Sequence, residues 1–363
     1  MTKNINARQA GILIFLCVLA NKFLLMPSLM FKDAHNDSVF SLIILFALDL
    51  LMLPVFFKLK KEYPDKKLFD ILSSKITKFF TIVIYTIFAV YFFFKTLLTF
   101  SVVYVYLKQQ VYQDEFVWIG RISVFPVINH SAVKGLRAFS RTIEFFFVVI
   151  LIGFISCLSF SLFTQLTMPI FFTSTAKNFL LSLYKNIFSF GDFLILFIII
   201  DKIKLKRGDE KIIYKYALLA MFLIVALFFL YFSKYQVTAF MHNNALSDIL
   251  VFSVNFNAVG RLDIISMLTI MFLNLFQLEI FCYGFSESLT TIFPLMSKVI
   301  AVIIYDILFF LCYFVFIGKY ENIITSFSVW LPIFAIFINY IFPLLCTALI
   351  IVNKFKNKKK LNI

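Results

Sequence analysis

The chain alternates between long apolar runs and short polar segments. Most apolar runs are roughly 20 residues long, the length of helix that crosses a hydrocarbon core of about 30 Å. They lack the every-second-residue alternation of barrel strands. The pattern predicts an all-α integral membrane protein, a single transmembrane domain over residues 1–363. About ten transmembrane helices are expected, at roughly 9–29, 38–57, 79–106, 113–130, 142–163, 186–202, 216–233, 262–285, 298–317 and 327–352.

Basic residues are distributed unevenly between the predicted loops. With the N-terminus in the cytoplasm, 24 of the 34 lysine and arginine residues fall on cytoplasmic segments and only 7 on the opposite side. Cytoplasmic loops carry such an excess of basic residues, so both termini are expected in the cytoplasm. The net charge of +15 therefore indicates topology and contact with lipid headgroups, not a nucleic-acid surface.

Composition agrees with this prediction, because 62% of residues are hydrophobic and only 15% are charged, against roughly 25% charged in soluble proteins. The five cysteines fall in or beside apolar runs without metal-like spacing and are expected as buried free thiols. The sequence shows no cleavable signal peptide. It also shows no nucleotide-binding loop, metal motif or nucleophile elbow, so we expect neither an enzyme nor a cofactor or metal.

Two segments outside the membrane are long. Residues 164–185 contain an apolar stretch, 178–184, that suits a short helix at the membrane interface. Residues 234–261 are more polar, and neither segment is large enough for a soluble domain.

Ionisable residues inside the predicted spans are candidates for function, since charge is costly in a bilayer. They are Lys22, Asp49, Lys95, Arg121, Asp192, Glu279 and Asp306. Asp49 and Asp306 are interpreted as structural partners, and Arg121 as a residue that snorkels to the interface. Lys95 is either a counter-ion for a ligand or the partner of Asp49, Glu279 or Asp306.

Asn21 and Lys22 lie in the middle of the first span and are followed by Pro27. Proline lacks an amide hydrogen and its ring clashes with the carbonyl four residues earlier, so the backbone near Phe23 loses its regular bond. Either the helix is broken and its free backbone groups hold a ligand, or it has a proline kink with Lys22 paired to a carboxylate. Lys22 itself could hold a ligand carboxylate, or it could pair with Asp192 or Glu279.

Gly191 and Asp192 predict a similar interruption in the sixth span, although Asp192 could instead lie among headgroups at its outer end. In the eighth span, Asn274 and Gln277 share one face. Hydrogen bonds between helices are the simpler interpretation of that pair, and ligand binding is the other.

An ordered set of short motifs runs along the chain. Arg8-Gln9 opens the first span, Tyr63-Pro64 follows the second, residues 135–141 (GLRAFSR) precede the fifth, Ser189 to Asp192 lie in the sixth, and Arg261-Leu262-Asp263 opens the eighth. The set resembles the permease-like B subunit of bacterial spore germinant receptors, within the amino acid–polyamine–organocation transporters. The chain departs from the family's usual pattern at Asn21-Lys22, at Gly260 and at Ile270.

The resemblance implies a five-plus-five inverted repeat with interrupted helices 1 and 6. It further implies a subunit of the spore inner membrane that senses a small nutrient, usually an amino acid, with an A-type membrane subunit and a C-type lipoprotein. The expected ligand site lies at the bilayer midplane between helices 1, 3, 6 and 8. Its lining is Ala20, Asn21, Lys22, Phe23, Lys95, Phe190, Gly191, Asn274 and Gln277. The alternative function is an ion-coupled amino acid transporter.

Overall fold

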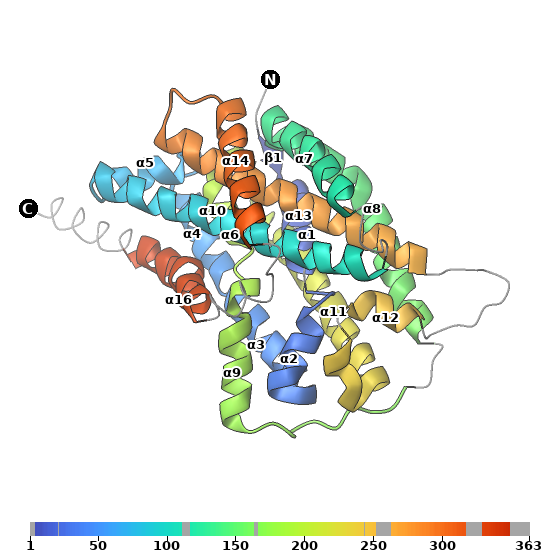
Figure 1. The fold of residues 1–363 in the computed structure, drawn as a ribbon. Coiled ribbons are helices and arrows are strands. Elements are labelled where there is room, and N and C mark those ends of the chain that lie inside the picture. The colour runs from blue at the N-terminus through green and yellow to red at the C-terminus, as the bar shows by residue number, and fades with distance from the viewer. Residues whose placement is uncertain are drawn as a thin grey trace, which may run out of the picture.

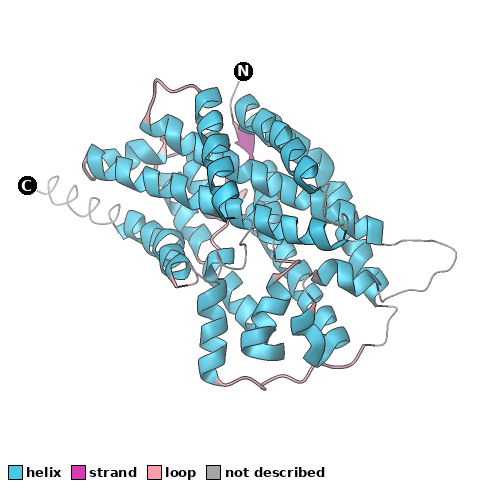
Figure 2. Ribbon diagram, viewed as in Figure 1, coloured by secondary structure: helices cyan, strands magenta, loops and turns pink. Residues whose placement is uncertain are grey.

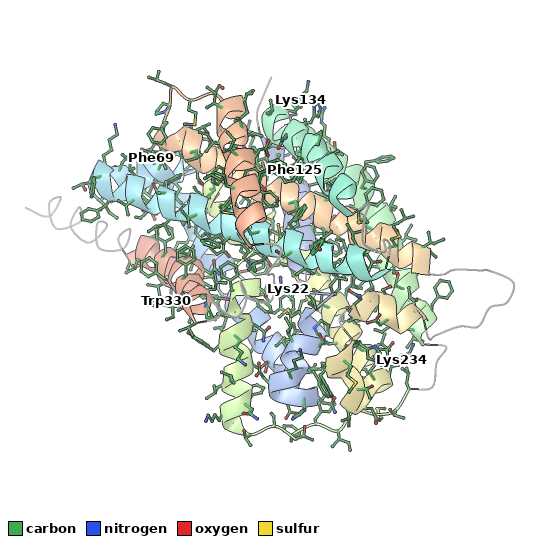
Figure 3. All side chains as sticks on the ribbon, viewed as in Figure 1. Lys22, Phe69, Phe125, Lys134, Lys234 and Trp330 are labelled. Carbon is green, nitrogen blue, oxygen red and sulfur yellow. The ribbon has the colours of Figure 1, made fainter. Side chains whose placement is uncertain are left out.

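A computed structural model describes residues 4–20, 22–110, 117–162, 166–242, 244–251, 263–316 and 329–348. These residues form a bundle of helices (Figures 1 and 2). The only strands among them are β1 (Ile5–Asn6) and β2 (Ile203–Lys204), which pair in parallel. Lys22 lies in the middle of the bundle, whereas Lys134 and Lys234 lie at opposite ends of it (Figure 3).

The α-helices are α1 (Ala7–Leu19), α2 (Met26–Ala34), α3 (Ser38–Leu50), α4 (Met52–Glu62), α5 (Leu68–Ser73), α6 (Lys78–Gln110), α7 (Val117–Lys134), α8 (Leu136–Ser161), α9 (Ala176–Asn186), α10 (Leu194–Ile198), α11 (Glu210–Tyr235), α12 (Ala245–Val251), α13 (Asp263–Ile292), α14 (Lys298–Phe316) and α16 (Trp330–Ile336). Short 3₁₀ segments are η1 (His35–Asp37), η2 (Ile187–Ser189), η3 (Ile200–Lys202) and η4 (Gln236–Met241), and a π-helical segment spans Phe337–Ile341.

Seven helical stretches in the described part of the chain are long and apolar enough to cross a membrane. One of them, Met26–Glu62, includes the turn at His35, where φ is +49°. The prediction of an all-α integral membrane protein is therefore confirmed. The count of ten helices and the inverted repeat stay predictions.

The first interruption lies between α1 and α2. A capping box starts α1, because the Asn6 side chain accepts from the Gln9 amide while the Gln9 side chain accepts from the Asn6 amide. The helix ends at Leu19, and α2 begins at Met26. Pro27 stands in the first turn of α2, where its missing N–H costs nothing. The proline thus starts the second half of a broken helix instead of kinking a continuous one.

The second interruption lies between η2 and α10, at residues 190–193. It coincides with the break expected near Asp192, but the helix before it differs from the expectation of a separate interfacial helix. Thr175 caps α9 by accepting from the Asn178 amide, and α9 runs directly into η2. The sixth segment therefore starts at Ala176 and not near residue 186, because α9 packs against α2 and α3, with Ser182 and Asn186 as its buried residues.

Candidate functional site

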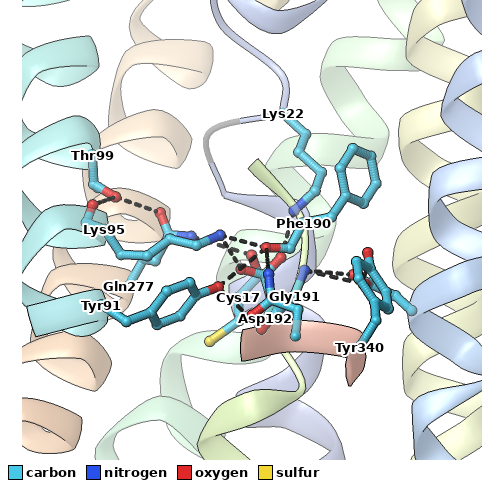
Figure 4. Close-up of polar contacts among 12 residues, drawn as sticks. Cys17, Lys22, Tyr91, Lys95, Thr99, Phe190, Gly191, Asp192, Gln277 and Tyr340 are labelled. Carbon is cyan, nitrogen blue, oxygen red and sulfur yellow. Dashed lines mark hydrogen bonds and ion pairs between the residues drawn. The ribbon is translucent and has the colours of Figure 1, made fainter. Parts of the chain in front are cut away.

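The two interruptions meet at a buried ion pair. Lys22 Nζ, from the first break, lies 2.5 Å from Asp192 Oδ2 in the second, and both side chains are essentially inaccessible. Lys95 reaches the same place from α6, where its Nζ donates to the Phe190 carbonyl at 2.7 Å and lies 3.5 Å from Asp192 Oδ1. Figure 4 shows these groups converging on the non-helical backbone.

Asp49, on α3, binds the second break from another side. Both of its carboxylate oxygens lie 3.0 Å from the Gly191 amide, and Tyr340 Oη donates to Oδ1 at 2.7 Å (Figure 4). Gly191 has φ +81°, and a Cβ at this position would lie 1.9 Å from Asn339 Nδ2. Only glycine fits both the left-handed backbone and the close approach of the π-helical segment. Asn339 and Tyr340 come from that segment, and π-bulges often occur at functional sites.

The Phe190 carbonyl has several donors besides Lys95. Tyr91 Oη lies 3.3 Å from it and Asn339 Nδ2 lies 3.4 Å from it. In the first break, the Phe23 carbonyl accepts from the Leu246 amide at the start of α12, at 3.1 Å. Irregular backbone at membrane depth must be covered by protein or line a cavity. In both breaks, other parts of the protein donate hydrogen bonds to the free carbonyl groups, so this backbone is covered by protein.

A cavity of about 250 Å³ adjoins this cluster, between α2, α6, the α9–η2 segment and α16. Lys95 lies on its wall together with mostly apolar side chains. Its lining is Leu25, Met26, Leu29, Lys32, Asp33, Lys95, Leu98, Val102, Lys185, Asn186, Phe188, Ser189, Leu331 and Pro332. Lys185 bridges α9 to Asp33 of α2 at 2.7 Å. A mostly apolar cavity with a few polar groups is typical of small-molecule sites, and this volume is below the usual range of about 300–1,000 Å³.

The structure brings four residues of the expected site, Lys22, Lys95, Phe190 and Gly191, into one hydrogen-bonded cluster. Ala20 is buried at the end of α1. Of the expected set, Lys95 alone lines the cavity described above. Asn21 lies outside the described residues.

Asn274 and Gln277, the polar pair on α13, bind different partners. Gln277 Nε2 donates to the Cys17 carbonyl at 3.2 Å, and Gln277 Oε1 accepts from Thr99 at 3.2 Å (Figure 4). Asn274 donates to the Ile270 carbonyl of its own helix. Gln277 therefore joins α13 to α1 and α6, whereas Asn274 donates within α13.

Sequence reasoning left Tyr91, Asn339 and Tyr340 out of the site and assigned Asp49 only a structural role. For Asn339 and Tyr340 the sequence held a weak signal, since they are adjacent polar residues in the middle of the last apolar run. The partner of Lys22 was left open between Asp192 and Glu279, and the geometry selects Asp192.

Broken helices that face each other around buried polar groups define a permease-like integral membrane protein. The sequence model of one family, described as spore germination protein, matches residues 4–321 of the chain. The protein belongs to this family and is a germination-related membrane protein. No curated protein matches the chain.

Proposed function

We propose that this protein is the nutrient-sensing, permease-like subunit of a spore germinant receptor. Family membership supports a role in germination. The cavity beside the two interrupted helices, with Lys95 on its wall, is the observation that carries the proposal. A small nutrient of the amino-acid class binds there and shifts the balance between two arrangements of the broken helices.

Lys95 is the group best placed to hold a ligand carboxylate. An ammonium group has three donors, and the Phe190 carbonyl and Asp192 carboxylate take two of them. Among the described residues no acceptor takes the third, which is therefore available to a ligand in the cavity. Apolar side chains of α2, α6 and α16, such as Leu29, Leu98 and Leu331, suit an aliphatic side chain. Lys22 does not line this cavity, so in this proposal it holds Asp192 in place.

The proposal includes the cellular setting implied by the resemblance. The protein lies in the spore inner membrane with both termini in the cytoplasm, and it signals through an A-type membrane subunit and a C-type lipoprotein. Deleting the gene should abolish or slow germination to one class of nutrient. Unchanged germination to every nutrient, in a strain without a redundant paralogue, would count against the proposal.

Binding is tested with the purified protein in lipid nanodiscs. A ligand that binds only the folded state raises the unfolding temperature, so a panel of amino acids should give a shift for one chemical group of them. Lys95→Met should abolish that shift. Lys298→Met is the matched control, because Lys298 is also paired with a buried carboxylate, Glu287, but does not line the cavity. An equal loss of the shift in both variants would show that Lys95 has no direct role.

Ion-coupled transport is the alternative that the broken helices also suit. The central cluster pairs two lysines, Lys22 and Lys95, with two aspartates, Asp49 and Asp192, so its formal charges balance without a coupling cation. This balance favours sensing. Uptake of a labelled amino acid by the protein alone in vesicles, driven by a proton or sodium gradient, would favour the transporter instead.

A further inference from the structure

Two further carboxyl groups, one buried and one partly buried, lie where α7, α13 and α14 pack together. Glu279, on α13, is 2% exposed and hydrogen-bonds Ser131 of α7. Asp306, on α14, accepts from Asn129 Nδ2 of α7 at 2.6 Å. Each carboxyl group has one buried oxygen with no hydrogen-bond partner, Oε2 in Glu279 and Oδ1 in Asp306.

This group is separate from the central cluster. Gln277 and Glu279 are two positions apart on α13, and successive helical residues turn by about 100°, so their side chains point in roughly opposite directions. Gln277 faces α1 and α6. Glu279 faces α7, away from Lys22, Lys95 and Asp192.

The two carboxyl groups lie at matching depth. Glu287 on α13 and Lys298 on α14 form an ion pair of 3.2 Å that joins these helices next to the turn between them. Glu279 precedes Glu287 by eight positions, and Asp306 follows Lys298 by eight. At 1.5 Å per residue, both lie about 12 Å from that pair. Each is bound to α7, Glu279 through Ser131 and Asp306 through Asn129.

No base neutralises these carboxyl groups within the part of the chain that the structure describes. Besides burial, the groups that act on the protonation of these two carboxyl groups are the hydrogen-bond donors Ser131 and Asn129. This contrasts with Glu287, which pairs with both Lys202 and Lys298.

The charged groups on the surrounding helices are turned elsewhere or lie too far away. On α6, Lys95 is bound to Phe190 and Asp192, and on α8, Glu144 pairs with Arg8. On α7, His130 and Lys134 are exposed, and the backbone of Arg121 lies eight positions before Asn129, about 12 Å of helix; the Arg121 side chain is outside the described part of the chain. Arg137 and Arg141 of α8 are at least partly exposed. Tyr305, of α14, and Cys282, of α13, are the remaining titratable neighbours.

We propose that Glu279 and Asp306 are two proton-binding groups, each of which carries a hydrogen in the folded protein. An ionised carboxylate buried without a cationic partner costs far more than a neutral acid, and it takes up a proton instead. Neither of the two unpartnered oxygens has a donor that would stabilise a negative charge, which favours the neutral acid. The two groups lie about two turns from the Glu287–Lys298 pair, which the predicted topology places at the cytoplasmic surface, so they would exchange protons with the cytoplasm. Loss of both protons would place two like charges against α7 and weaken its packing.

Infrared spectroscopy of the full chain in nanodiscs at neutral pH tests the proposal. The carbonyl stretch of a protonated acid is separate from the bands of a carboxylate. The wild type should show this acid band, Glu279→Gln should remove its glutamate component, and Asp306→Asn should remove its aspartate component. Glu287→Gln is the matched control, and it should leave the acid band unchanged because Glu287 is paired with two lysines.

Selective carbon-13 labelling of glutamate keeps the test decisive if a variant fails to fold. In the wild-type chain, labelling should move part of the acid band, and labelling of aspartate should move the rest. Acidic deuterated buffer provides the reference in which every exposed carboxyl group is protonated. Absence of an acid band at neutral pH, or a glutamate component that survives Glu279→Gln, would overturn the proposal.

Discussion

Lys22 and Asp192 join the two helix interruptions through an ion pair of 2.5 Å that is closed to solvent. The residues are 170 positions apart in sequence, so the pair fixes the first break directly against the second. Ring faces surround the ammonium group as well, since Lys22 Nζ lies 5.0 Å from the centre of the Phe190 ring and 5.9 Å from that of Phe46. Each partner depends on the other for neutrality, which makes the pair sensitive to any change on one side.

Replacing Lys22 by alanine should destabilise the protein. Removal of one partner of a buried ion pair costs about 3–5 kcal/mol, because the remaining charge stays buried, and Lys95 at 3.5 Å from Asp192 should offset part of that cost. Unfolding in detergent measures the loss, and the double variant Lys22→Met/Asp192→Asn should recover part of it. A stable Lys22→Ala protein that has lost about 1.5–3 kcal/mol of ligand affinity would instead identify Lys22 as a ligand-binding group.

Replacing Gly191 by alanine should be more damaging than the same change at Gly208. Both glycines have positive φ, +81° and +94°, so both substitutions introduce backbone strain of about 1–3 kcal/mol. Only at Gly191 does the new Cβ also overlap Asn339, since nothing lies within 4 Å of the position at Gly208. Unfolding temperatures of the two variants provide the comparison. Asn339→Ala should partly rescue Gly191→Ala, and equal effects at the two glycines would show that the contact with Asn339 is unimportant.

The short helix α12 should become more stable on acidification. Burial raises the pKa of Asp248 to about 6, although the Asn244 amide and Lys234 act in the opposite direction. The folded state therefore binds more protons than the unfolded state between the ordinary aspartate pKa and about 6, so stability falls as pH rises through that window. Neighbouring His242, whose Nδ1 lies 3.9 Å from Asp248 Oδ2, acts in the opposite direction because burial lowers its pKa. In a His242→Gln background, hydrogen exchange of the α12 amides, corrected for intrinsic rates, should slow from about pH 7 to about pH 5. Asp248→Asn should remove this dependence, and an unchanged slope would show that another group titrates.

Cysteine labelling tests the predicted orientation. Lys206 and Lys177 are both exposed, and the basic-residue bias predicts the first inside and the second outside. Each is replaced by cysteine in a chain whose five native cysteines have been changed to serine or alanine. An impermeant maleimide should label position 177 and not 206 in intact cells. Labelling at 206 from outside would reverse the topology. Position 60 is a poor probe, because Lys60 is only 6% exposed and bonds to the Ile200 carbonyl.

The sequence predicted the helical membrane class and both interruptions because these depend on local signals, namely apolar length, a proline after polar residues, and a glycine beside a carboxylate. It did not predict that Lys22 would form its ion pair with Asp192 and not with Glu279. Partner choice depends on how helices distant in sequence rotate against each other. For the same reason, the sequence did not show that Asp49 accepts a hydrogen bond from the Gly191 amide, or that Tyr340 donates to Asp49. The extent of α9 was missed because its polar face resembles an interfacial helix, while its packing against α2 is visible only in three dimensions.

The two-residue strands have a mechanical consequence. β1 immediately precedes α1 and β2 follows η3, so Ile5 and Ile203 tie the start of the first interrupted helix to the end of the sixth. This strand pairing lies at the end of α1 that is far from the first break. Because β1 is joined to α1 and β2 follows α10 and η3, a tilt of α1 would be passed to the α10–η3 segment, and the reverse. The halves of the two broken helices that carry these strands are thus joined, so a movement at the breaks would reach both together, on the side of the membrane that the basic residues predict to be cytoplasmic.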